Sequence, residues 1–156
     1  MVQLLLSRGA EPNMTDNDGF TPLYHAAQRG DKQVIHLLIK EGADPNMVTP
    51  QGASPLHIAA EEGKEGATQV LLANGADPNK ANERGFTPLH LATLHDRYFV
   101  VKLLLRRGAA VNKADEDGRT PLFYALRGGT PYIAQGNSTL EIAKILIKRG
   151  GIEKSY

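Results

Sequence analysis

The sequence predicts an all-α solenoid, a stack of helix–turn–helix units in which each unit packs only against its neighbours. Two markers recur at one interval of 33 residues. The first is a tripeptide of Thr or Ser, Pro and Leu, which begins at Thr21, Ser54, Thr87 and Thr120. The second is a Gly-Ala pair, which begins at Gly9, Gly42, Gly75 and Gly108. Two independent markers with one period indicate a repeat protein.

The unit from residue 16 to residue 48 shows the expected elements in chain order. It opens with Asp-Asn-Asp-Gly at residues 16–19, which is typical of a turn. Thr21 is placed to cap a first helix, and Pro22 suits the first helical position, where its missing N–H costs nothing. Gly30 is expected to end this helix in the left-handed conformation. A second helix then runs to Gly42, with apolar residues on one face and polar residues on the other.

Helices this short are not stable alone in water, so the array is predicted to be the folding unit. Apolar residues keep their places from unit to unit, and one such column is Leu5, Leu38, Leu71, Leu104 and Leu146. The predicted organisation is one array over residues 1–156, with a half repeat at 1–15, full repeats at 16–48, 49–81 and 82–114, and a final repeat at 115–156 with an insertion near 128–138.

The consensus of the units resembles a known family. Residues 85–92 read Gly-Phe-Thr-Pro-Leu-His-Leu-Ala, and the units end close to V-x-L-L-L-x-x-G-A-D-P-N. This pattern covers nearly the whole chain and resembles the ankyrin repeat. The resemblance implies stacked helix pairs with β-hairpin finger loops that project at right angles. It also implies that the fingers and the first helices form a concave side, which usually binds another protein.

The first unit departs from the pattern because residues 1–15 contain a second helix and its trailing hairpin without a first helix. Its apolar residues Val2, Leu5 and Leu6 therefore lack a complete partner on their N-terminal side, although terminal repeats normally carry a polar outer face. Two interpretations stay open: the chain is a piece of a longer array, or something else covers this end. The chain is expected to be a monomer, with this end as a candidate for self-association.

The last unit is longer than the others. Gly108 and Gly150 are 42 residues apart instead of 33, so nine residues are added between a first helix expected at 120–127 and a second at 140–148. Tyr132 and Ile133 are the bulky residues of the insertion. A functional loop and a tolerated loop expansion both fit. In the preceding unit, Asp96 stands where the others have Gly, so that first helix is expected to end differently.

Composition and missing motifs exclude several classes of function. A net charge of +1 gives no long-range attraction to nucleic acid or to a membrane, and no apolar run approaches the roughly 18 residues that span a bilayer. Without cysteine there is neither a disulfide nor a thiolate zinc site, which fits an intracellular protein, in the cytoplasm or the nucleus. No phosphate-binding loop or nucleophile motif is present, so we expect no enzyme activity and no cofactor.

The histidines do not indicate catalysis. His57 and His90 share one repeat position, which Tyr24 and Phe123 occupy in the other two full units. A repeated catalytic or metal-binding role would not survive those replacements, whereas a structural role would. A carboxylate–imidazole metal site near His57 is the alternative, because Glu61, Glu62 and Glu65 follow it, but a solvated helix end is the simpler interpretation.

Function in a repeat protein is expected where the period does not dictate the residue. Phe20 and Phe86 follow finger glycines, and large apolar groups near Arg are typical anchors at interfaces. The alternative, that each Phe packs on its own hairpin, stays open. The candidate partner-binding residues are Phe20, Arg29, Glu61, Glu62, Arg84, Phe86, His95, Arg119, Arg127 and Tyr132. The predicted function is a non-catalytic protein–protein interaction module; the alternative is an adaptor or regulatory segment of a larger multidomain protein.

Overall fold

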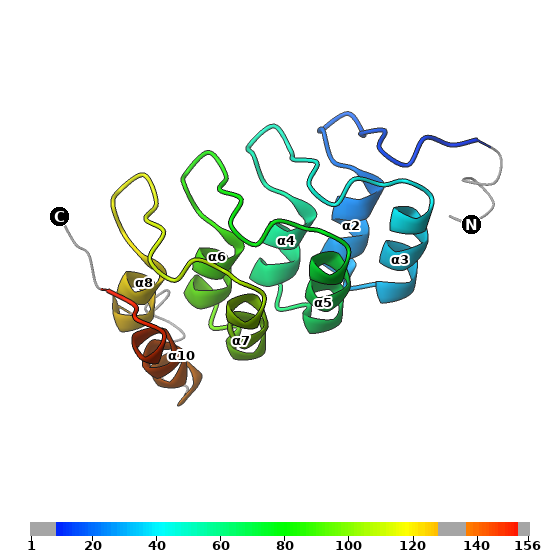
Figure 1. Cartoon of the computed structure of the whole chain (residues 1–156). Coiled ribbons are helices and arrows are strands. Elements are labelled where there is room, and N and C mark those ends of the chain that lie inside the picture. The colour runs from blue at the N-terminus through cyan, green and yellow to red at the C-terminus, as the bar shows by residue number, and fades with distance from the viewer. Residues whose placement is uncertain (1–8, 128–136, 153–156) are drawn as a thin grey trace.

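The computed structural model describes residues 9–127 and 137–152, and these contain eight helices in four pairs (Figure 1). Each pair consists of a first helix, preceded by a finger loop, and a second helix that runs back beside it. The pairs are α2 (Pro22–Arg29) with α3 (Lys32–Lys40), α4 (Pro55–Glu61) with α5 (Glu65–Ala73), α6 (Pro88–Leu94) with α7 (Tyr98–Arg106), and α8 (Pro121–Arg127) with α10 (Asn137–Lys148).

The helices form two layers. The first helices α2, α4, α6 and α8 pack in a row, and the second helices α3, α5, α7 and α10 pack in a parallel row (Figure 1). The core lies between the rows, where the predicted leucine column is at most 1% exposed at Leu38, Leu71, Leu104 and Leu146. The predicted all-α solenoid is therefore confirmed. The N-terminal Val2, Leu5 and Leu6 lie outside the described residues.

The helix ends follow the expected capping chemistry. The Thr21 hydroxyl accepts a hydrogen bond from the Tyr24 N–H at 3.1 Å, and Gly30 ends α2 with φ of 79°. Asp96, which replaces that Gly after α6, has φ of 58°. The prediction that α6 ends differently is therefore wrong, because the backbone makes the same left-handed turn with a non-glycine residue. Asp is among the few residue types that tolerate this conformation.

The fingers are hairpin loops with no strand in the described part of the chain. In the finger of the third full unit, the Asn82 N–H donates to the Phe86 carbonyl at 2.9 Å and the Gly85 N–H donates to the Asn82 carbonyl at 2.9 Å. The other three fingers close in the same way. These loops are too short for strand pairing, so the implied β-hairpins are present as tight turns without a β-ladder. As expected, residues 13–19 and 79–85 contain no helix.

A repeated asparagine binds each unit to the next. Asn13 accepts from the Asp44 N–H at 2.8 Å through its side-chain oxygen and donates from its amide nitrogen to the Gly42 carbonyl at 3.1 Å. The equivalent asparagines make the same two bonds to the following unit, at Asn46, Asn79 and Asn112. Both partners are backbone atoms of the loop that follows a second helix. This asparagine clamp fixes the spacing of neighbouring units.

The last pair differs from its predicted bounds. Helix α8 begins at Pro121, and α10 begins at Asn137, three residues before the expected Leu140. The reason lies in the added turn of α10, where the hydroxyls of Ser138 and Thr139 both donate to the carboxylate of Asp96. The remainder of the predicted insertion, residues 128–136 with Tyr132 and Ile133, lies outside the described residues. Among the described helices, none is long and apolar enough to span a membrane.

Candidate partner-binding surface

The two finger phenylalanines lie against rings that project from the first helices. The Phe20 ring centroid is 4.9 Å from that of Tyr24 on α2. The Phe86 ring stacks on His90 of α6 at 5.6 Å and meets the edge of Tyr124 on α8 at 5.5 Å. Both phenylalanines are half-buried. They therefore pack on first helices, and not on their own hairpins alone, while part of each ring stays accessible.

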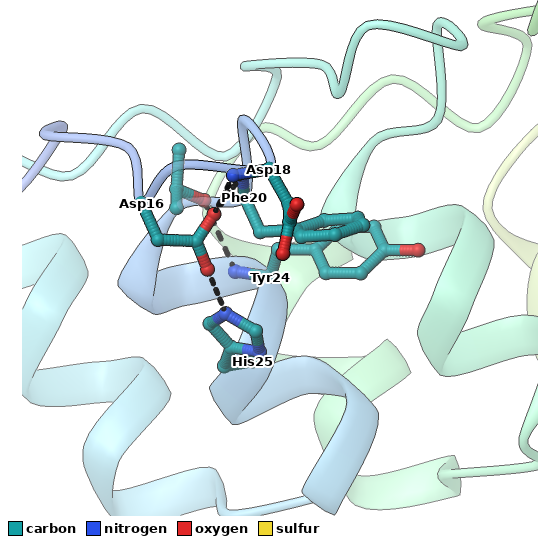
Figure 2. A network of polar contacts seen from close by, with 6 residues as sticks. Asp16, Asp18, Phe20, Tyr24 and His25 are labelled. Atoms are coloured by element: carbon teal, nitrogen blue, oxygen red, sulfur yellow. Dashed lines mark hydrogen bonds and ion pairs between the residues drawn. The ribbon is translucent and has the colours of Figure 1, made fainter.

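The finger that carries Phe20 is fastened to α2 by one carboxylate (Figure 2). Oδ1 of Asp16 accepts from the N–H groups of Asp18 at 3.1 Å and Phe20 at 2.9 Å, and Oδ2 lies 2.8 Å from Nε2 of His25. The contact with His25 and the backbone N–H groups hold the pKa of Asp16 below its usual value. Figure 2 shows the Phe20 and Tyr24 rings side by side next to this network.

The finger of the last unit has the same arrangement with a different partner. Oδ1 of Asp115 accepts from the N–H groups of Asp117 and Arg119, both at 2.9 Å, and Oδ2 accepts from the Tyr124 hydroxyl at 2.5 Å. Burial of Tyr124, together with this bond to a carboxylate, raises the pKa of its hydroxyl. Tyr124 stands at the repeat position of His25, so both outer fingers are tied to the same place on their first helix.

Two arginines flank an aromatic ring on α8. The guanidinium carbon of Arg119 is 5.3 Å from the centroid of Phe123, and that of Arg127 is 4.9 Å away. These distances permit cation–π attraction to the ring. Sequence reasoning chose both arginines but assigned Phe123 only a structural role. Phe123 and Arg127 are four residues apart on α8, which puts their side chains on one helix face, and this spacing was the available signal; Arg119 lies on the finger before the helix and gave no such signal.

His57 and His90 connect neighbouring units. Nδ1 of His57 accepts from the Ser54 N–H at 3.0 Å, so the proton is assigned to Nε2, which donates to the Phe86 carbonyl of the next finger at 2.9 Å. His90 binds the Thr87 N–H and the Arg119 carbonyl in the same way. Burial lowers the pKa of His57 to about 4 and also lowers that of His90.

These bonds leave neither histidine a free ring nitrogen for a metal. In the described part of the chain, no group of three or more His, Cys, Asp or Glu side chains could hold a metal ion. The alternative of a carboxylate–imidazole site near His57 does not fit, because Oε1 of Glu61 lies 3.5 Å from Nε2 of His95 in the next unit. His57 itself is 1% exposed and is enclosed by protein.

The comparison with known families follows the same repeats. A family model described as "Ankyrin repeats (3 copies)" matches the chain twice, over residues 1–82 and residues 65–155. The chain belongs to the ankyrin repeat family. Ankyrin repeats are generally protein–protein interaction modules and are typically not catalytic. A search of curated proteins finds no match to the chain.

On this ankyrin repeat array, the predicted residues form separate groups. Phe20 lies at the first full unit, the Glu61–His95 pair lies in the middle, and Phe86 meets the last unit near Arg119 and Arg127. Three further predicted residues, Arg29, Glu62 and Arg84, are exposed and form no ion pair with described residues, and Tyr132 lies outside the described part. Three aromatic residues that belong to these groups were not among those predicted, namely Tyr24, Phe123 and Tyr124.

Proposed function

We propose that this ankyrin repeat chain binds another protein through the surface formed by its fingers and first helices. The observation that carries the proposal is a set of half-buried rings: Phe20 and Phe86 pack on first helices, and Phe123 lies on the first helix α8 beside Arg127. Aromatic and arginine side chains dominate the binding energy of interfaces. Rings that are already positioned lose little conformational freedom on binding, so more of their contact energy contributes to affinity.

The fingers supply the preorganisation that this function needs. Asp16 and Asp115 hold their own finger backbones through two N–H bonds each and reach a first-helix side chain as well. The finger of Phe86 is held by Asn82, whose side-chain oxygen accepts from the N–H groups of Arg84 and Phe86, both at 3.0 Å. Phe20, Phe86 and Arg119 therefore lie on fingers that internal hydrogen bonds hold in place, and Phe123 lies on α8.

The identity of the partner and the surface can be tested together. A photo-crosslinking amino acid placed at Phe86 should capture the partner in cell extract, whereas the same group at Lys40 on α3 should not. Affinity is then measured with the purified partner. Arg119→Ala, Arg127→Ala and Phe86→Leu should each weaken binding, by about 1–3 kcal/mol for a true anchor. Phe86→Leu is preferred to Phe86→Ala because it keeps an apolar contact with His90 and Tyr124.

The matched control is Lys144→Glu, which reverses an exposed charge on α10, in the row of second helices. It should leave affinity close to that of the unmodified chain. Thermal melts of every variant separate lost binding from lost folding. If Lys144→Glu abolishes binding while Arg119→Ala and Arg127→Ala bind normally, the proposed surface is wrong.

A further inference from the structure

The row of second helices carries a groove that the surface described above does not use. Lys102 and Arg106, one turn apart on α7, stand between two hollows. The hollow toward α5, about 470 Å³, is lined on its other side by Lys32 and Glu65. The hollow toward α10, about 270 Å³, is lined by Lys148 and Arg149 over the apolar side chains of Leu105 and Ile145. We call the two hollows together the basic groove.

The basic groove carries an excess of positive charge among the described residues. Its lining holds five cations and one carboxylate, that of Glu65. The four ion pairs of the described residues involve none of these five cations. The Lys102 ammonium lies 5.3 Å from the Tyr98 ring, and Arg149 donates to the Leu105 carbonyl at 3.4 Å. Because the whole chain has a net charge of only +1, this local excess is a strong asymmetry.

An exposed aromatic side chain that the repeat does not require borders the groove. Phe99 lines the hollow between α5 and α7 and is 62% exposed. The equivalent residues of the other units are Gln33, Gly66 and Glu141, so the repeat does not require an aromatic side chain here. Gly66 opens the facing wall, and the Lys32 side chain lies across it, because a Cβ on Gly66 would come within 2.4 Å of the Lys32 Cδ. The hollow thus pairs exposed apolar area with positive charge.

We propose that the basic groove binds an acidic peptide segment of a protein, independently of the finger surface. Carboxylates of the peptide pair with Lys102 and Arg106 and, beyond α7, with Lys148 and Arg149. A bulky apolar side chain of the peptide packs on Phe99. Arginine forks suit carboxylates, and the apolar floor of the α7–α10 hollow suits peptide side chains. Glu65 at the edge would repel the continuous phosphate charge of a nucleic acid, whereas a peptide can place an uncharged residue there.

The test uses the full chain and fluorescence anisotropy at low salt. The probe is a labelled peptide of Asp and Glu residues with one central Leu. Its controls are the same peptide with Asn and Gln, the same acidic peptide with Ser for Leu, and a single-stranded oligonucleotide of equal charge. The groove variant is Lys102→Glu with Arg106→Glu. The matched control is His36→Glu with Lys40→Glu, because these residues hold the same repeat positions on α3, outside the groove.

The acidic peptide should bind saturably and the Asn/Gln peptide should not. The groove variant should weaken the peptide at least about tenfold, since charge-assisted contacts are lost, whereas the α3 variant should bind as the unmodified chain does. Phe99→Ser should weaken the Leu peptide but not the Ser peptide. No saturable binding, equal weakening by both double variants, or an oligonucleotide that binds more tightly and displaces the peptide would each overturn the proposal. Circular dichroism confirms that the variants are folded.

Discussion

The two inner units, 49–81 and 82–114, fasten their fingers differently from the two outer units, 16–48 and 115–156. The outer fingers begin with an aspartate, which reaches His25 or Tyr124 on its own first helix. The inner fingers begin with Thr49 and Asn82. The repeat position of His25 and Tyr124 is occupied there by the apolar residues Ile58 and Leu91. Instead, the inner units carry a buried histidine, His57 or His90, directly before Ile58 or Leu91. The outer units carry Tyr24 and Phe123 at that repeat position.

The outer fingers are held by contacts within one unit, whereas the histidines of the inner units form hydrogen bonds to the next unit. The Asp16–His25 contact joins a finger to its own helix and is exposed to solvent, where such pairs contribute little to stability. The bonds of His57 and His90 cross to the carbonyl of the next finger and are buried, so their loss leaves polar groups without partners. The stability of the inner units is therefore predicted to depend on the neutral imidazoles of His57 and His90. Loss of the exposed Asp16–His25 contact is predicted to change the stability of the first full unit little.

The largest expected effect is a loss of stability in mild acid. The pKa of His57 is about 4 in the folded chain and near 6.5 when unfolded, so the unfolded chain binds the additional proton between those values. The contribution of neutral His57 is therefore complete above about pH 6.5, decreases as the pH falls and is lost by about pH 4, which removes about 3 kcal/mol. His90, whose pKa is also lowered, adds to the loss. Urea unfolding at a series of pH values measures it.

The control for this pH dependence is the double variant His57→Phe with His90→Phe. It should be less stable than the unmodified chain at neutral pH but nearly flat across the same window, because the titrating groups are gone. A variant with an unchanged pH profile would show that other groups carry the acid sensitivity, and the assigned role of the imidazoles would be wrong.

The second prediction compares an inner with an outer unit at neutral pH. His57→Phe should destabilise the chain by about 1–3 kcal/mol, since the Ser54 N–H and the Phe86 carbonyl lose their buried partner. His25→Phe should leave the melting temperature nearly unchanged. Partner binding should survive in the folded His57→Phe chain. Equal destabilisation by both variants would remove the distinction between inner and outer units.

The third prediction concerns the junction between the last inner unit and the last outer unit. The positive φ of Asp96 is unfavourable for a non-glycine residue, but the Asp96 carboxylate accepts hydrogen bonds from the hydroxyls of Ser138 and Thr139. Asp96→Ala loses those bonds and keeps the unfavourable φ, whereas Asp96→Gly loses the bonds and relieves it. The Gly variant should therefore be more stable than the Ala variant by about 1 kcal/mol in urea unfolding. The opposite order would mean that the backbone is not held left-handed here.

The smallest effect is expected at two buried threonines of the inner units. Thr93 is 2% exposed, and its hydroxyl has no hydrogen-bond partner among the described residues, while Ala27 and Ala60 hold the same repeat position. Thr93→Ala should be neutral or stabilising, by up to about 1 kcal/mol. Thr68 is also buried, but its hydroxyl donates to the Lys64 carbonyl at 2.9 Å, so Thr68→Ala should destabilise. Thermal melts of the pair decide this, and a destabilised Thr93→Ala chain would contradict it.

The sequence predicted the features that depend on local chemistry or on the 33-residue repeat. The cap at Thr21, the left-handed Gly30 and the leucine column all follow from residue type and spacing. It also predicted that His57 is structural, because Tyr24 and Phe123 replace it. It could not identify the bond to the Phe86 carbonyl, since a backbone acceptor in the next unit has no sequence signature.

The candidate surface was less predictable because it depends on contacts between units. The contact between Phe86 and Tyr124 depends on how α8 packs beside α6, and the spacing of residues along the sequence does not give that packing. The early start of α10 depends on Asp96, a residue more than 40 positions away. By contrast, the fastening of the outer fingers had a readable signal: aspartate occurs at the finger base in the two units that have His25 or Tyr124 nine residues later.

The asparagine clamp bears on how this chain can change in evolution. Because each clamp binds only backbone atoms of the following unit, it places no demand on the neighbour's side chains, and units can be duplicated, deleted or exchanged by whole periods. Asn112 makes the same two bonds across the longer last unit, to the Gly150 carbonyl and the Ile152 N–H, so the nine added residues were accommodated without a new junction. Asp96 is the counterexample. Its partners are the side chains of Ser138 and Thr139, which ties the third and fourth full units together as an inherited pair.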